Sequence, residues 1–223
     1  MYENIIAIPY RNRSEHLDYF IKHTVPLFLE YMPNTKVVVV EQNEGKLFNR
    51  GAVLNVAFKE YKNKTKFFFT HDVDMNPTRD LVKFVYTKED IDIYRIMSSH
   101  DSSLGGIIKV KHNILFDING FPNNIWGWGI EDRALYYKCC IKNINITLNS
   151  MRNFNIRPHI NNAENYINEK KTISDMWMDG YISQLNEQQK KDMIMSSGLN
   201  NLEYTILERK NIHDIVELIK VDI

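Results

Sequence analysis

The stretch WGWGIEDR, at residues 126–133, places aromatic rings, glycines and paired carboxylates next to one another. Trp126 and Trp128 offer flat apolar walls against which a sugar ring can pack, and the glycines let a backbone approach a ligand closely. Glu131 and Asp132 fall at the start of an apparent helix, where the helix dipole favours carboxylates. One carboxylate can hold a hydroxyl while its neighbour accepts a proton. A tryptophan-rich core turn with two helix-capping acids is the alternative, and the pattern alone favours both interpretations equally.

A second acidic pair follows an apolar run, in KFFFTHDVDMNP at residues 66–77. Asp72 and Asp74 point to the same side of an extended chain, because strand side chains alternate. At a strand end, this D-x-D pair can bind a hard divalent cation, which offsets the charge of a diphosphate, or a sugar hydroxyl. A solvated turn is the alternative, since two acids at this spacing often occur by chance.

Arginines lie close to two other predicted strand ends. Arg11 and Arg13 follow the first strand in PYRNR, and Arg50 begins a helix in LFNRGAVLNVAF. Guanidinium groups and helix N-termini both favour anions. Each arginine alone is typical of a protein surface, whereas the three together indicate one anionic ligand.

These groups require a frame that brings strand ends together. Apolar, partly β-branched runs predict strands at 4–10, 35–42 and 66–77. A helix is expected from a Ser14 cap to about Tyr31, and another from an Asn49 cap to about residue 62. This alternation predicts an α/β fold with a parallel sheet, whose ligands gather at the carboxyl ends of the strands.

The second half of the chain is less regular. Residues 149–180 are rich in asparagine and poor in pattern, so we expect a long functional loop with one helical turn. The other expected elements are strands at 105–110, 144–148, 204–210 and 217–223, a turn at 119–124, and a helix from Glu131 to about Lys142.

Composition excludes several classes of protein. The chain has 223 residues, with 28 Lys+Arg and 28 Asp+Glu, so its formal net charge is zero. The overall charge therefore does not indicate nucleic acid or an anionic membrane as a partner. No apolar run reaches the length of a membrane span, and the N-terminus lacks the features of a signal peptide. Cys139 and Cys140 are adjacent, which excludes a disulfide scaffold and favours a reducing compartment.

Five motifs occur in the order seen in the β-1,4-galactosyltransferase family, glycosyltransferase family 7. They read IPYRNR, LFNRGAVLNVAF, HDVDMNP, INGFPNNIWGWGIED and SSGLNNLEYTIL, and the chain resembles the family from about residue 5 to residue 223. The resemblance implies a GT-A-type nucleotide-sugar-binding fold, with a central, mostly parallel twisted sheet flanked by helices and a long flexible loop in the second half. It also implies one glycosyltransferase domain over 1–223, with a nucleotide-sugar-binding half at about 1–100 and an acceptor-binding, catalytic half at about 101–223.

The same resemblance implies a reaction and a set of residues. An inverting, metal-dependent enzyme of this kind moves a hexose from a UDP-sugar to a hydroxyl of a glycan or glycoconjugate, with Mn²⁺ or another divalent cation as cofactor. Asp132 matches the general base, and Glu131 matches the residue that holds a donor hydroxyl. The donor-binding residues carried over are Pro9, Arg11, Arg13, Phe48, Arg50, Asp72, Val73, Gly106, Trp128 and Glu131. The acceptor-binding residues are Trp128, Asp132 and Arg133, and the metal ligands are Asp74 and His159.

Departures from the family pattern affect the acceptor and the metal. Arg133 follows Asp132 where the family has a third acid, which leaves the acceptor open. The stretch between His159 and SSGLNNL shows no acceptor pocket resembling the family's QRFDRI motif, so N-acetylglucosamine is not predicted as the acceptor. Ile156 stands three residues before His159, where the family has a second ligand, and its side chain cannot bind a metal. We therefore expect weaker metal binding or a set completed by water, with an ordinary loop histidine as the alternative for His159.

The donor pocket also departs from the pattern. Ser103 and Leu104 precede the paired glycines, where galactose-specific members have a Tyr-Phe pair. A small residue leaves room for a larger 2-substituent, so donors of the galactose, N-acetylgalactosamine and N-acetylglucosamine types all stay open.

Two further functions stay open beside the active transferase: a catalytically weak or degenerate sugar-binding module, and a nucleotide-sugar hydrolase. Asp74, Glu131 and Asp132 occur together, which favours the enzyme because a pure binder needs no base. Family members are usually Golgi proteins with a membrane anchor and disulfides. Since this chain shows neither, we expect a soluble cytoplasmic protein of viral or microbial origin.

Overall fold

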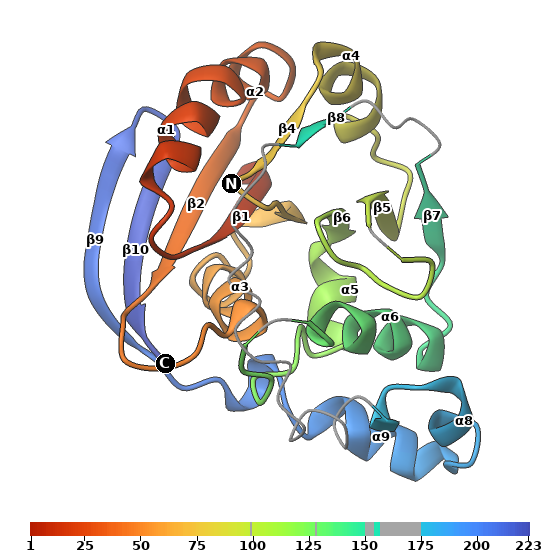
Figure 1. Ribbon diagram of the computed structural model, residues 1–223. Coiled ribbons are helices and arrows are strands. Elements are labelled where there is room, and N and C mark those ends of the chain that lie inside the picture. Colours follow the sequence, from red (N-terminus) through yellow and green to blue (C-terminus); the bar gives the residue numbers. More distant parts are fainter. Residues whose placement is uncertain (99, 128, 150–153, 157–174) are drawn as a thin grey trace.

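The computed structural model describes residues 1–98, 100–127, 129–149, 154–156 and 175–223. Its centre is a sheet of eight strands in the order β7-β5-β6-β3-β1-β2-β10-β9 (Figure 1). Strand β1 pairs in parallel with β2 and β3, and the β10–β2 and β5–β7 pairs are parallel too. The strands are β1 Tyr2–Tyr10, β2 Thr35–Gln42, β3 Thr65–Thr70, β5 Ile93–Met97, β6 Ile107–Lys111, β7 Ile146–Leu148, β9 Thr205–His213 and β10 Val216–Asp222. The predicted α/β fold with a mostly parallel central sheet is confirmed.

Helices cover both faces of this sheet, and a short β4–β8 pair lies beside it (Figure 1). The α-helices are α1 Ser14–His23, α2 Val25–Tyr31, α3 Arg50–Glu60, α4 Arg79–Leu81, α5 His112–Asp117, α6 Glu131–Ile141, α8 Asp179–Ile182 and α9 Glu187–Met195. The remaining elements are the π-helical turn η1 Val82–Tyr86, the 3-10 turn η2 Leu199–Asn201, β4 Met75–Pro77 and β8 Phe154–Ile156. None of the described helices is both long enough and apolar enough to cross a membrane.

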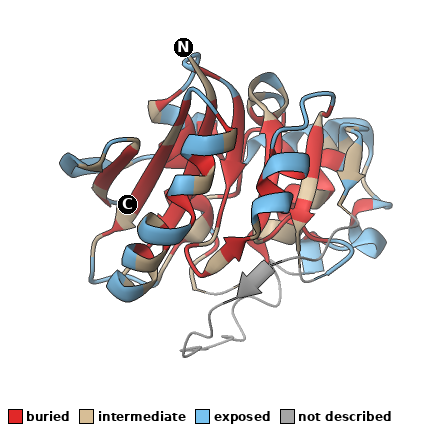
Figure 2. Ribbon diagram, turned by 90° about the horizontal axis from the view of Figure 1, so that it is seen from above, coloured by how far each residue is buried: buried red, intermediate tan, exposed pale blue. Residues whose placement is uncertain are grey.

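The central strands are apolar on both faces because each face carries its own hydrophobic core. Ile5 and Ala7 of β1 pack with α3, α5 and α6, whereas Ile6 and Ile8 pack with α1, α2 and η1. This alternation explains why β1 and β2 read as continuous apolar runs rather than as alternating ones. The buried strands are visible between the partly exposed helices in Figure 2.

A third, smaller core lies beneath the second half of the chain. It joins α6, α8 and α9, and its buried members are Ile125, Ile130, Ala134, Tyr137, Trp177, Ile182 and Met193. This cluster supports the start of α6, where the paired acids lie.

The helix caps show one confirmed prediction and one wrong one. The Asn49 side chain accepts a hydrogen bond from the Ala52 amide at 2.9 Å, so it caps α3 as expected. Ser14, by contrast, is the first residue of α1, and Arg13 occupies the cap position without a side-chain bond. The predicted single helix to Tyr31 breaks at Thr24, because Pro26 in the first turn of α2 has no amide hydrogen to continue α1.

Other differences concern the region beyond residue 66. The predicted strand at 66–77 is divided into β3 and β4 by the turn that carries the two aspartates. Strand β5 and helix α9 were not predicted, although Asn186 and Gln189 form a capping box at the start of α9. The predicted loop at 149–180 contains β8 and begins α8, while residues 150–153 and 157–174 lie outside the described part of the chain.

Candidate functional site

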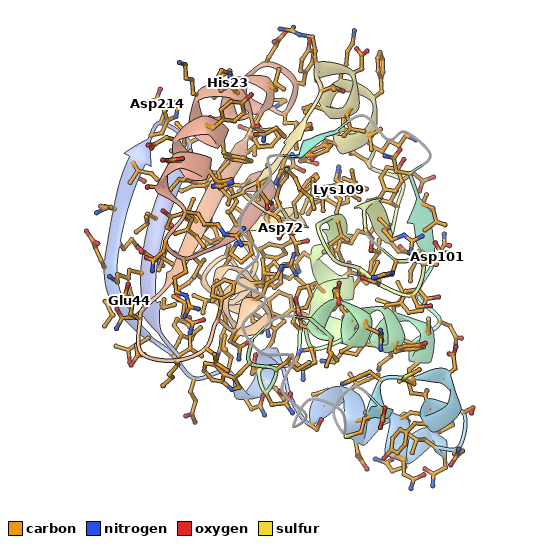
Figure 3. All side chains as sticks on the ribbon, in the orientation of Figure 1. His23, Glu44, Asp72, Asp101, Lys109 and Asp214 are labelled. Atoms are coloured by element: carbon orange, nitrogen blue, oxygen red, sulfur yellow. The ribbon has the colours of Figure 1, made fainter. Side chains whose placement is uncertain are left out.

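Arg50 links the two halves of the molecule at the carboxyl end of the sheet. It lies on the first turn of α3, and its Nη2 and Nε atoms donate to Asp72 Oδ1 at 2.8 and 3.1 Å. Its Nη1 atom lies 3.7 Å from Oε1 of Glu131, the first residue of α6. Asp72 follows β3 and lies near the middle of the molecule (Figure 3). The fold therefore brings together three side chains that are far apart in the sequence.

Burial dominates the electrostatics of this cluster. It raises the pKa of Glu131 from 4.5 to about 7, with Asp132 adding to the rise and Arg50 opposing it. Burial acts to lower the pKa of Arg50, but the charges of Asp72 and Glu131 outweigh it and raise that pKa above its ordinary value. Arg50 Nη1 and Glu131 Oε2 are buried atoms without a hydrogen-bond partner among the described residues. Such atoms are costly unless a ligand or water satisfies them.

Asp132 has its two carboxylate oxygens held by different segments. Oδ1 accepts from the Arg133 amide at 2.8 Å, and Oδ2 accepts from Ser103 Oγ at 2.7 Å. The backbone at Gly105 is so close that an added Cβ would stand 2.4 Å from Oδ2. The loop before β6 is thus pressed against the second acid of α6, and a side chain at position 105 would displace the Asp132 carboxylate.

Asp74 and the arginines after β1 form the other side of the site. Asp74 is 4% exposed, and its Oδ2 lies 3.4 Å from Nη1 of Arg13. The Arg11 guanidinium lies 5.1 Å from the centre of the Phe48 ring, and its Nη1 donates to the Lys46 carbonyl at 2.8 Å. The structure therefore places the planar Arg11 cation over an aromatic ring and Arg13 beside a buried carboxylate.

The remaining candidates in the first half act through the backbone or the core. Pro9 is buried in β1 opposite Val40 of β2, and Val73 is buried against the core beneath α1 and α2. Gly106 has φ +68°, and an added Cβ would stand 2.9 Å from the Met97 carbonyl. Its carbonyl lies 3.5 Å from Arg50 Nη2, so this glycine turn directs a backbone oxygen into the cluster.

The turn after residue 125 connects the acids of α6 to the loop before α3. The Gly127 amide donates to the Phe48 carbonyl at 2.7 Å. Trp126 is partly exposed and lines an open apolar depression with Lys46 and Leu47. Trp128 lies outside the described residues, so its predicted contact with donor and acceptor stays a prediction.

The predicted metal site is only partly within the described chain. Asp72 and Asp74 supply carboxylate oxygens, which suit a hard divalent cation. Across the described residues, however, no group of three or more His, Cys, Asp or Glu side chains comes together as a metal site. His159 lies outside those residues. Of the predicted ligands Asp74 and His159, the described part of the chain therefore contains Asp74, whose carboxylate suits such a cation.

His71 is close to the two aspartates but has a structural environment. Its Nε2 atom lies 3.0 Å from the Tyr86 hydroxyl, and its Nδ1 atom lies 3.0 Å from the Asp72 carbonyl. Burial lowers the pKa of His71 to about 4, so the ring is neutral at physiological pH. Both ring nitrogens are engaged, which removes His71 as a metal ligand in this arrangement.

The NGFPNN turn has partners that sequence reasoning missed. Asn55 of α3 donates to the Phe121 carbonyl at 2.7 Å and accepts from the Phe121 amide at 3.0 Å. Asn123 donates through its side chain to the Gly198 carbonyl at 2.6 Å. The turn therefore joins α3 to the SSGLNN segment. The many asparagines in both motifs could have indicated side-chain hydrogen bonds, although the sequence does not show which residues they bond to.

Lys138 of α6 anchors the same turn from below. Its ammonium donates to the carbonyls of Gly120 and Ser197, each at 3.0 Å, and lies 3.4 Å from the Asn119 carbonyl. The side chain is fully buried, and burial lowers the pKa of Lys138 to about 7. Since α6 begins with Glu131, this anchor fixes the helix that carries the acids.

The fold and the converging arginines and carboxylates define a class of protein, the glycosyltransferases with a GT-A fold. A crystal structure of a Drosophila β-1,4-galactosyltransferase 7 variant in complex with manganese, UDP-Gal and xylobiose superposes with a TM-score of 0.77, at 19% identity over 100% of this chain and 94% of that one. S. aureus TarS 1–349 gives a TM-score of 0.55 at 13% identity, over 86% of this chain and 69% of that one. At these identities the likeness shows the fold, and the predicted GT-A fold is confirmed.

Two family models then name the family. The model described as the N-terminal region of glycosyl transferase group 7 matches residues 1–87, and the model described as the N-terminal domain of galactosyltransferase matches residues 88–161. The chain belongs to the glycosyltransferase 7 family, as the sequence motifs predicted.

Curated relatives agree with this assignment. Bos taurus β-1,4-galactosyltransferase 1 is 29% identical over 215 residues, which is 91% of this chain and 50% of the relative. Homo sapiens β-1,4-galactosyltransferase 4 is 32% identical over 152 residues, which is 64% of this chain and 44% of the relative. The chain thus spans about half the length of these relatives.

Proposed function

We propose that this chain transfers a hexose from a UDP-sugar to a hydroxyl of a glycan or glycoconjugate, with inversion at the anomeric carbon. The observation that carries the proposal is the meeting of Arg50, Asp72 and Glu131 at the carboxyl end of the sheet, with Asp132 next to Glu131 in the first turn of α6. Membership of the glycosyltransferase 7 family supports the reaction class. We further propose that residues 1–100 supply the donor site and residues 101–223 the acceptor and catalytic groups of one domain.

On the donor side, the proposed roles follow charge and shape. Phe48 and Arg11 offer an aromatic ring and a stacked guanidinium, which suit a nucleobase. Arg13 and Arg50 supply positive charge for the diphosphate. Glu131 holds a sugar hydroxyl, and its unpartnered Oε2 supports this role. Because the pKa of Glu131 is about 7, its carboxyl group can accept or donate that hydrogen bond near neutral pH.

On the acceptor side, Asp132 is the proposed general base. Its carboxylate takes the proton of the acceptor hydroxyl while the hydroxyl oxygen bonds to the anomeric carbon. The bond from that carbon to the diphosphate breaks on the opposite side, which inverts the centre. Trp128 and Arg133 flank Asp132 in the sequence, and we propose that they contact the acceptor.

A divalent cation such as Mn²⁺ is the proposed cofactor. Asp74 and His159 are the proposed protein ligands, with Asp72 nearer the donor sugar. When bound, the cation supplies positive charge that offsets the negative charge of the departing diphosphate. The free thiols of Cys139 and Cys140 support our proposal of a cytoplasmic, reducing location.

The proposal is tested first by donor binding. Calorimetry with UDP-galactose, UDP-N-acetylgalactosamine and UDP-N-acetylglucosamine, in manganese and in EDTA, should show tighter binding of at least one donor with the metal. A panel of glycan acceptors then tests transfer, with donor hydrolysis measured in parallel. The exposed Asp80→Asn variant is the matched control for variants of the site aspartates. Absence of binding by every donor in manganese would contradict the proposed function.

A further inference from the structure

The Ser103 hydroxyl makes a directed contact with the proposed base. Ser103 is 4% exposed and lies in the loop between β5 and β6. Its Oγ donates to Asp132 Oδ2 at 2.7 Å and accepts from the Gly105 amide at 3.2 Å. A serine hydroxyl has one proton, and here a carboxylate is its acceptor. Hydrogen bonds to an ionised group are stronger than those between neutral groups.

The surroundings leave the Asp132 carboxylate little freedom to rotate. Its other oxygen accepts from the Arg133 amide at 2.8 Å, and the Asp132 carbonyl accepts from the Leu104 amide at 3.1 Å. Gly105 closes the space on the Oδ2 side. The loop and the helix start are therefore joined through both the backbone and the side chain of Asp132.

Ser98 extends this arrangement by one hydroxyl. Its Oγ lies 3.2 Å from Ser103 Oγ, and also 3.2 Å from the His100 carbonyl. Ser98 has one proton, which either the His100 carbonyl or Ser103 Oγ can accept, whereas the Gly105 amide can only donate to Ser103. Ser103 Oγ thus accepts from Gly105 and donates its own proton to Asp132.

We propose that Ser103 is a positioning residue that orients the Asp132 carboxylate toward the acceptor hydroxyl. The inference rests on the proposed function, since it assigns a role relative to the proposed base. A carboxylate that is held on both oxygens keeps its free lone pairs in one direction, which favours proton transfer from an acceptor bound there. Ser103 itself touches neither the proton in transit nor the reacting carbon.

A structural role for Ser103 in the loop alone predicts something different. It would lower stability or donor binding without a specific effect on turnover. The positioning role predicts a fall in kcat that depends on Asp132. The two roles are therefore separated by comparing kcat, the donor dissociation constant and the melting temperature in the same set of variants.

The test uses Ser103→Ala, with Ser102→Ala as the matched control in the same loop, and Ser103→Thr as the variant that keeps a hydroxyl. Loss of a hydrogen bond to a charged group should lower kcat roughly tenfold in Ser103→Ala. Donor affinity and melting temperature should stay close to parental values. Ser103→Thr should recover most of the turnover, and Ser102→Ala should match the parent.

A double-mutant cycle with Asp132→Asn completes the experiment. If Ser103 acts through Asp132, Ser103→Ala should change the residual rate of Asp132→Asn by less than about twofold. An equal fall in both backgrounds, or parental turnover in Ser103→Ala, overturns the inference and leaves the proposed function standing. A parental protein that binds donor but neither transfers nor hydrolyses it overturns both.

Discussion

The ionisation of Glu131 should make the folded protein less stable as pH rises. Its pKa is raised from 4.5 to about 7, mainly by burial and in spite of Arg50. Between those values the unfolded chain has released a proton that the folded protein still holds, so rising pH favours unfolding. The stabilisation is complete below pH 4.5 and is lost as pH rises through about 7.

The size of the effect follows from the two pKa values. Their difference, at about 1.4 kcal/mol for each pH unit, gives a loss of about 3 kcal/mol in the free energy of unfolding. Most of that loss should fall between pH 5 and pH 8. Glu131 is only 6% exposed, so solvent screening should reduce this figure little.

Glu131→Gln tests this reasoning because it keeps the shape of the side chain and removes its ionisation. Arg50 retains its bonds to Asp72 in the variant. Urea unfolding followed by circular dichroism should give similar stabilities near pH 5, and a variant that is more stable by about 2–3 kcal/mol near pH 8. The same variant should bind the donor less well. The parental glutamate would then favour donor binding at the expense of stability.

The control is Glu203→Gln, which changes an exposed glutamate before β9. Its stability relative to the parent should not vary with pH in this way. A difference between Glu131→Gln and the parent that is constant from pH 5 to pH 8 would refute the reasoning. It would mean that Glu131 is ionised across the whole range, with Arg50 offsetting its burial.

Three further changes probe the base, the cation and the anchor of α6. Asp132→Asn should lower sugar transfer by roughly 10²–10⁴ and leave donor affinity nearly unchanged, measured by single-turnover assays and calorimetry; parental transfer would place the base elsewhere. Asp74→Asn should abolish most of the manganese-dependent gain in donor affinity, and Asp72→Asn should affect that gain less. Equal donor affinities of the parent in EDTA and in manganese would refute a metal role. Lys138→Met should lower the free energy of unfolding by about 3 kcal/mol, because it leaves buried carbonyls without a donor. Lys138→Arg should lower it less, and equal losses of the two variants in urea titrations would show that the cation is not needed.

The first half of the fold was readable from sequence because its signals are local. The apolar runs of β1 and β2 and the Asn49 cap each lie within a few residues. Strand β5 was missed because it pairs with β6 and β7, which both follow it in the chain and begin about ten residues or more beyond its end. Short segments of this kind carry no periodicity that separates them from a loop.

The candidate site shows the same division. The motifs placed Arg50, Asp72 and Glu131 among the donor-binding residues, and the structure brings these three side chains together, while their roles stay predictions. No pattern indicated that Ser103 would donate to Asp132, because that contact joins residues 29 positions apart. The sequence names residue types, whereas the partner of a buried hydroxyl depends on how two distant loops pack.

Ile130, the residue before the paired acids, has two requirements that oppose each other. Its φ of +84° is a left-handed conformation, which costs a β-branched L-residue of the order of 1–3 kcal/mol, whereas glycine adopts it freely. Its side chain, 5% exposed, fills part of the core between α6 and α9, which glycine would leave empty. None of the twenty encoded residues meets both requirements, because glycine adopts this backbone but has no side chain for the core, and the others are strained at positive φ. Ile130→Gly would relieve the backbone cost and empty part of this core, so its free energy of unfolding measures the balance of the two at the helix that bears the proposed base.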